Sequence, residues 1–184
     1  FKYKLVDKNL FYLVSGLVLV FITITIPVQL DGNWVTLLWA GEAALLFWIG
    51  RTKNISVYEK LSYPLMILAF LSLIQDWGVN YGYYYLESSV TRLTPVFNVN
   101  FFTAMLFVAA LGFIYYLNKN KSYKPALNAE NGLLTIVNFA IPAVVIFVLY
   151  YAFRIEIENY WDQLYIDSSV VISNGEEDYP ETYM

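Results

Sequence analysis

The stretch LFYLVSGLVLVFITITIPV, which covers residues 10–28, contains no charged residue. Its length is close to the roughly 20 apolar residues that a helix needs to cross the hydrocarbon core of a bilayer. The apolar residues surround the helix axis and show no alternation of period two, which argues against a strand of a transmembrane barrel. Because a segment in hydrocarbon must satisfy its own backbone hydrogen bonds, the stretch predicts a transmembrane helix.

Four further stretches of this kind follow, over residues 34–50, 61–77, 96–117 and 132–153. The stretches 34–50 and 61–77 are equally long and are the shortest, and each contains one charged residue: Glu42 near the middle of the first and Asp76 near the end of the second. The predicted fold class is therefore all-α: a polytopic helical membrane protein with about five transmembrane helices in a bundle over residues 1–153.

An acidic extracytoplasmic segment is expected over residues 154–184. Its first part has apolar residues at the spacing of an amphipathic helix, which predicts an outer helix followed by a loop. These residues are Ile157, Tyr160, Trp161, Leu164 and Tyr165.

The composition fits a membrane protein and excludes several kinds of chemistry. Hydrophobic residues make up 59% of the chain and charged residues 14%, against about 45–50% and about 25% in soluble domains. The chain has no Cys and no His, which excludes disulfides, thiol nucleophiles, imidazole bases and Cys/His zinc sites within it. It also lacks a phosphate-binding glycine loop and a basic run for nucleic acid. No metal, cofactor or nucleic-acid partner is expected.

The basic residues predict the orientation in the membrane. All of them except Arg92 and Arg154 precede the first stretch or lie in alternate connections after it. They are Lys2, Lys4, Lys8, Arg51, Lys53, Lys60, Lys119, Lys121 and Lys124. Because cytoplasmic loops are enriched in Lys and Arg, the N-terminus is expected in the cytoplasm and the acidic C-terminal segment outside.

Glu42 is the first candidate for a functional residue, because an ionised carboxylate near the centre of a membrane helix costs several kcal/mol. The functional interpretation is a proton, ion or substrate contact. The structural interpretation, which we favour, is a protonated carboxyl that hydrogen-bonds across a helix interface. Ala40 and Ala44 form a small-residue face that suits such packing. Asn138 is the strongly polar residue expected at comparable depth, so it is the predicted partner of Glu42.

A second candidate site lies at the outer helix ends. Asp31, Asp76, Asn98 and Asn100 are predicted there, and their carboxylates and amides could line a binding vestibule. The simpler interpretation, which we favour, is that these residues cap helices. Asp31 and Asn33 would then cap the second helix, and Asn98 or Asn100 the fourth.

The stretch LDGNWVTLLWAGEAALLFWIGR, residues 30–51, resembles a signature of a family of large, uncharacterised bacterial multi-pass membrane proteins, the domain of unknown function 2339. The similar features are the short Asp-Gly turn and a Trp-x-x-Glu-Ala core, here Trp39, Glu42 and Ala43. The segment Phe97–Leu111 also looks like a recurrent segment of the family. The resemblance covers about the first two thirds of the chain. It implies a bacterial inner-membrane protein longer than this chain, and it implies no activity.

Three functional classes remain open. The favoured one is a structural or assembly component of an envelope complex. The second is a transporter or flippase that uses Glu42. The third, least favoured, is a membrane enzyme that acts on lipid-linked glycans at the outer face and needs carboxylates such as Asp31 and Asp76 to converge. The expected partners are the lipid bilayer and further transmembrane helices, from the same chain or from other membrane subunits.

Overall fold

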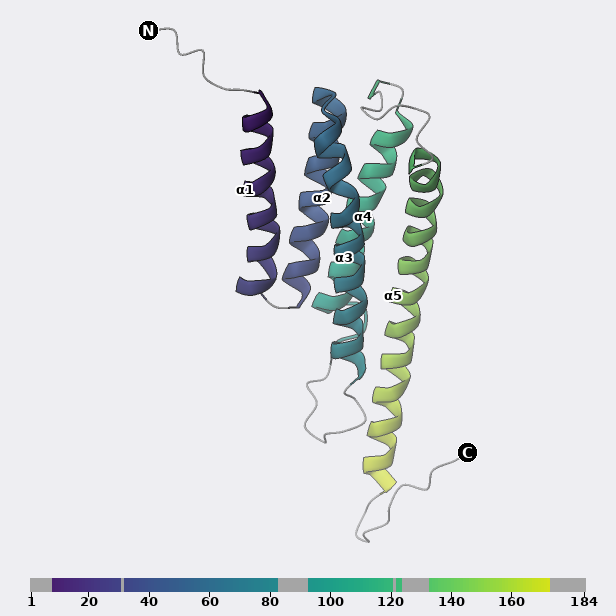
Figure 1. Ribbon diagram of the computed structural model, residues 1–184. Coiled ribbons are helices and arrows are strands. Elements are labelled where there is room, and N and C mark those ends of the chain that lie inside the picture. The colour runs from purple at the N-terminus through teal and green to yellow at the C-terminus, as the bar shows by residue number, and fades with distance from the viewer. Residues whose placement is uncertain (1–7, 31, 83–92, 121, 124–132, 173–184) are drawn as a thin grey trace.

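The computed structural model describes residues 8–30, 32–82, 93–120, 122–123 and 133–172 (Figure 1). Within these residues the regular structure is entirely helical, which confirms the predicted all-α class. The helices are α1 (Lys8–Gln29), α2 (Asn33–Lys53), α3 (Ser56–Gly82), α4 (Val99–Lys119) and α5 (Leu133–Ile172).

Two helices are longer than the sequence pattern predicted. One of the two shortest predicted segments, residues 61–77, lies inside the 27-residue α3, and α5 has 40 residues instead of ending at Phe153. The predicted outer amphipathic helix is therefore the continuation of α5. No Gly or Pro interrupts residues 154–172, and an exposed ion pair between Arg154 and Glu158, one turn apart, supports the helix there. At 1.5 Å per residue, α5 is about 60 Å long.

Three of the helices described are long and apolar enough to cross a membrane: the spans Ser56–Tyr81 in α3, Val99–Lys119 in α4 and Ile136–Tyr165 in α5. The apolar part of α1, Val14–Ile26, is shorter. Helix α2 contains Glu42 near its middle and ends with Arg51 and Lys53.

The helices run alternately in opposite directions (Figure 1), so that the ends of α2 and α4 that contain Lys53 and Lys119 lie at the same end of the bundle. Helix α2 packs on α3 and α4, α4 packs on α5, and α1 stands at the edge against α2. The buried core comes from α2 to α5. It consists of Ala40, Phe47, Ala69, Leu73, Trp77, Ala104, Phe107, Leu111, Ile114, Leu117, Ile141, Val148 and Ala152.

The connection between α2 and α3 brings these two helices unusually close. Asn54 ends α2 in the left-handed conformation, with φ 55°, and the N–H of Ile55 donates to the carbonyl of Gly50 over 2.9 Å. The chain thereby reverses within a few residues. A Cβ atom added at Gly50 would lie 2.7 Å from the backbone nitrogen of Glu59. Only glycine therefore fits at position 50 without moving the α3 backbone.

Replacement of Gly50 by alanine is expected to destabilise the protein by about 1–3 kcal/mol, because the added methyl group meets backbone rather than a flexible side chain. Gly112 in α4 is the matched control, since nothing lies within 4 Å of an added Cβ there. Gly112→Ala should be neutral or stabilising by up to about 1 kcal/mol through helix propensity. Thermal unfolding of both variants in detergent measures the difference, and equal effects would contradict the close approach.

Candidate functional site

The distribution of side chains differs from that in a water-soluble protein. Many large apolar side chains are exposed, with Phe97 at 87% and Phe139 at 79% exposure. Several charged and amide side chains are buried beside the apolar core. The buried polar or charged residues are Thr36, Arg51, Glu59, Ser62, Asp76, Asn100, Thr103, Glu156 and Asn159. These residues, together with Glu42, are the candidates for a functional site.

Glu42 contacts α1. The Thr23 hydroxyl lies 3.1 Å from Oε1 and 3.3 Å from Oε2 of Glu42, and it also donates to the carbonyl of Leu19 over 2.9 Å. A hydroxyl has one proton. If that proton goes to Leu19, the Thr23 oxygen is free to accept a hydrogen bond from a protonated Glu42 carboxyl. Ala40 and Ala44 pack into the core on the opposite side of α2, because residues two apart on a helix are turned by about 200°.

The same threonine is held a second time through its backbone. Pro27 has no N–H, so the carbonyl of Thr23 has no donor four residues further along α1. The indole Nε1 of Trp39 donates to this carbonyl over 3.1 Å. Trp39 and Glu42 lie one turn apart on α2, so they contact Thr23 together. The Trp-x-x-Glu pair in this chain therefore joins α2 to α1 at the point where Pro27 interrupts the helical hydrogen bonds.

Asn138 does not contact Glu42. Its Oδ1 accepts a hydrogen bond from Nδ2 of Asn118 over 2.8 Å, across the interface between α5 and α4. The predicted pairing of the two residues is therefore wrong. The expected equal depth was its only basis, and it does not hold: through Asn118, Asn138 is linked to Arg51 in the last turn of α2. Glu42 contacts Thr23 of α1, and α1 and α5 flank the bundle on opposite sides (Figure 1).

The end of the bundle that contains Lys53 and Lys119 also contains a buried ion pair, which the sequence analysis missed. Nη2 of Arg51 lies 3.0 Å from Oε1 of Glu59, and the two side chains are 1% and 0% exposed. Arg51 also donates to Oδ1 of Asn118 and, over 3.3 Å, to the carbonyl of Tyr123. Its guanidinium carbon lies 4.9 Å from the centroid of the Phe47 ring. Arg51 thus links α2, α3, α4 and the segment after α4.

Further partners complete the environment of Glu59. The hydroxyl of Tyr63 donates to Oε1 of Glu59 over 3.1 Å, and the hydroxyl of Ser62 donates to the Glu59 carbonyl over 2.7 Å. Arg51 was expected in a cytoplasmic connection, as one of several basic residues there. The close approach at Gly50 explains its burial, because it brings the end of α2 against the start of α3. A Gly-Arg pair followed eight residues later by Glu was the available signal.

At the opposite end of the bundle, Asp76 contacts Thr36. The Thr36 hydroxyl lies 2.8 Å from Oδ2 of Asp76 and 2.7 Å from Oγ of Ser72. Close to them, Oδ1 of Asn100 accepts hydrogen bonds from Asn33 over 2.8 Å and from Asn80 over 2.9 Å. These contacts join α2, α3 and α4. Asp31 lies outside the described residues.

The capping predictions have mixed outcomes. Asn98 caps α4, since its Oδ1 accepts from the N–H of Phe101 over 2.9 Å. The residue before α2 is Gly32, which has no side chain to cap it, and Asn33 is the first helical residue. The prediction that Asn33 caps α2 is therefore wrong. Asp76, Asn98 and Asn100 lie at the same end of the bundle but have different hydrogen-bond partners.

Glu156, which the sequence analysis expected in the acidic extracytoplasmic segment, has the most hydrogen bonds among the described carboxylates at this end of the bundle. It is buried and accepts from Tyr81 Oη over 2.6 Å, from Asn98 Nδ2 over 2.7 Å and from the N–H of Val96 over 2.7 Å. Val96 has a φ of 66°, which is rare for a β-branched residue. Asn159 and Gln163, on the same face of α5, donate to the Leu93 carbonyl. The segment before α4 is thus attached to α5.

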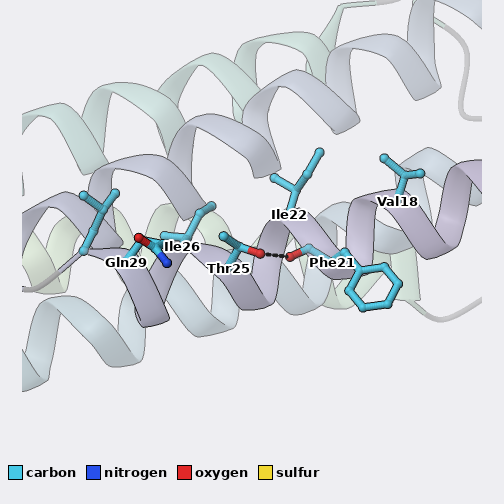
Figure 2. A pocket seen from close by; sticks show the side chains of 7 residues that line it. Val18, Phe21, Ile22, Thr25, Ile26 and Gln29 are labelled. Atoms are coloured by element: carbon cyan, nitrogen blue, oxygen red, sulfur yellow. Dashed lines mark hydrogen bonds between the residues drawn. The ribbon is translucent and has the colours of Figure 1, made fainter.

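Two surface grooves among the described residues bear on these candidates. The first, of about 390 Å³, lies along one face of α1 and is lined by apolar side chains, with Thr25 and Gln29 as its polar members (Figure 2). The Thr25 hydroxyl donates its proton to the carbonyl of Phe21, so this proton is not available to a ligand in the groove (Figure 2). The second groove, of about 330 Å³, lies between the α1–α2 turn and α3. We call it the Asp76 groove; its lining is Leu30, Gly32, Val35, Trp39, Leu68, Leu71, Ser72, Gln75 and Asp76.

The chemistry of these groups is that of hydrogen bonding and charge pairing. Within the described part of the chain, no three acidic side chains approach closely enough to hold a metal ion. Asp76 and Glu156 are buried among different partners, so the described residues do not place two carboxylates on one reacting centre.

Comparison with known proteins finds no matching family model, no matching curated protein and no matching solved structure.

Loss of the buried ion pair should destabilise the protein strongly. Arg51→Met leaves Glu59 buried without its cation, which is expected to cost about 3–5 kcal/mol of unfolding free energy. Arg154→Met breaks an exposed pair, whose members are 47% and 51% exposed, and should cost less than about 1 kcal/mol. Denaturant titrations of the two variants in the same detergent measure both losses. A small loss for Arg51→Met would show that the pair is not buried in solution.

Proposed function

We propose that the chain forms a helical bundle that crosses a bacterial inner membrane five times and serves as a structural or assembly component of an envelope complex. The observation that supports a membrane location is the large number of exposed apolar side chains on helices that bury several charged and amide side chains among themselves. A bilayer removes the free-energy cost of exposing such apolar surface to water.

Crossings by α1 and α2 are part of this proposal. With 22 and 21 residues, each is about 30 Å long at 1.5 Å per residue, which matches the hydrocarbon core. Lys53 and Lys119 lie at one end of the bundle. Glu156 and Glu158 lie in the C-terminal half of α5, toward the opposite end. By the positive-inside rule we place the N-terminus in the cytoplasm and the C-terminal segment outside.

The structural role is supported most directly by the ion pair between Arg51 and Glu59. The two charges neutralise each other within the bundle, and the contacts of Arg51 hold α2 against α3 and α4. A transporter that uses Glu42 would need water to reach this carboxyl. Glu42 instead contacts Thr23 and lines neither of the two grooves. We therefore assign Glu42, with Trp39, to the attachment of α1.

The resemblance of residues 30–51 to the family of uncharacterised bacterial membrane proteins belongs to the same proposal. In it, the Trp-x-x-Glu core joins the first two helices of an array. The exposed apolar faces of α1 and α5 then contact lipid, further helices of the same protein or other membrane subunits. Phe21 on α1 and Ile146 on α5 are examples, at 61% and 67% exposure.

Single cysteines test the proposed orientation, and the chain offers a clean background because it has none. We expect Glu158→Cys to react with a membrane-impermeant maleimide in intact spheroplasts, and Lys53→Cys to react only after permeabilisation. Both native side chains are exposed. If both cysteines react from the same side, the number of membrane crossings between them is even. That result would contradict the proposed topology, in which the number is odd.

Glu42→Gln should leave the protein folded and its unfolding free energy changed by less than about 1 kcal/mol, because the amide still hydrogen-bonds to Thr23. Trp39→Phe is the comparison. It leaves the Thr23 carbonyl without a donor and should cost about 1–3 kcal/mol. Thermal unfolding in detergent measures the difference. The full-length Glu42→Gln protein should also co-purify with the same membrane proteins as the wild type. A large loss on Glu42→Gln would mean that an ionised Glu42 is required.

A further inference from the structure

The Asp76 groove changes from apolar to polar along the axis of α3. Leu68 and Leu71 line its inner part, and Ser72, Gln75 and Asp76 line its outer part. Their spacing of three and four residues places all five on one face of the helix. The groove therefore has one aliphatic and one polar end, and its volume of about 330 Å³ is within the usual range of ligand pockets.

Asp76 has fewer partners than the other buried carboxylates. Glu59 pairs with Arg51, and Glu156 accepts three hydrogen bonds. Asp76 is 6% exposed, and its one hydrogen bond within the described residues comes from Thr36, to Oδ2. Its other oxygen, Oδ1, faces Gly32, where an added Cβ would lie 4.0 Å away. A buried carboxylate needs further donors or a positive charge.

The depth of the groove identifies the kind of molecule that reaches it. Asp76 lies six residues before the end of α3, and Thr36 lies in the first turn of α2. If α2 matches the hydrocarbon core, as the proposed function requires, both lie at the boundary between acyl chains and lipid head groups. Leu71, at 55% exposure, opens the inner end of the groove toward the surrounding bilayer.

We infer that the Asp76 groove binds a lipid whose head group has a primary ammonium, with the ammonium on Asp76 and an acyl chain along Leu68 and Leu71. The ammonium supplies the positive charge and the donors that Asp76 lacks, and the oxygens of Ser72 and Gln75 are further acceptors for its protons. A quaternary ammonium has no proton to donate. An anionic head group without an amine is repelled by the carboxylate. This inference rests on the proposed membrane location.

The test compares three lipids with the same acyl chains on the full-length protein: phosphatidylethanolamine, phosphatidylcholine and phosphatidylglycerol. The protein in nanodiscs or detergent is titrated with each lipid, and bound lipid is counted by native mass spectrometry. Wild type is expected to prefer phosphatidylethanolamine by about tenfold or more, the size of one charge-assisted hydrogen bond. Equal binding of the three lipids would mean that the lipid is only annular, and would overturn the inference.

Asp76→Asn keeps an oxygen that accepts from Thr36 but removes the charge, so it should abolish the preference for phosphatidylethanolamine while the protein stays folded. Glu158→Gln, at an exposed carboxylate of α5, is the matched control and should retain it. If Asp76→Asn fails to fold, Leu71→Trp fills the groove at an exposed position and should abolish the preference instead. A preference that survives in a folded Asp76→Asn or Leu71→Trp protein would overturn the inference. Failure of the wild type to enter nanodiscs would contradict the proposed membrane location separately.

Discussion

A polar group that is buried away from water has to find its partner within the protein, and the packing of this bundle depends on that constraint. The clearest case is the pair of Arg51 and Glu59, whose side chains are almost completely buried. Taking either charge out of water alone costs several kcal/mol, so each residue holds the other in place. The pair requires α2 and α3 to approach closely, and Gly50 permits this by having no side chain.

At the end of the bundle that contains Glu156, neutral donors satisfy the buried carboxylate. Glu156 is enclosed by Tyr81, Asn98 and the backbone of Val96, and these donors come from α3, α4 and the segment before α4. The left-handed conformation of Val96 costs about 1–3 kcal/mol. In this conformation the N–H of Val96 donates a hydrogen bond to the Glu156 carboxylate. Polar contacts thus hold the helices together at each end of the bundle, and an apolar core from α2 to α5 lies between the two ends.

Features that depend on neighbouring residues in the sequence were predicted well, whereas contacts between distant residues were not. The length of an apolar run is local, so the approximate positions of five helices followed from the sequence. A cap on α4 at Asn98 or Asn100 followed from their position before an apolar run, and the cap is Asn98. The pairing of Asn138 with Glu42 failed because neither the depth of Asn138 nor the helices that it contacts could be read from the sequence. The burial of Arg51 and Glu156 was missed for the same reason, since a charged residue near a helix end looks solvated until its neighbouring helices are known.

The central claim is that the exposed apolar surface faces hydrocarbon. Spin labels on single cysteines along α5 test it, with molecular oxygen as a lipid-soluble relaxant and a nickel chelate as a water-soluble one. Ile146 is 67% exposed and lies within the uncharged stretch 132–153, whereas Glu158 lies beyond that stretch, about three turns further along α5. The account predicts high oxygen and low nickel accessibility for a label at position 146, and the reverse at position 158. High nickel accessibility at position 146 would contradict it.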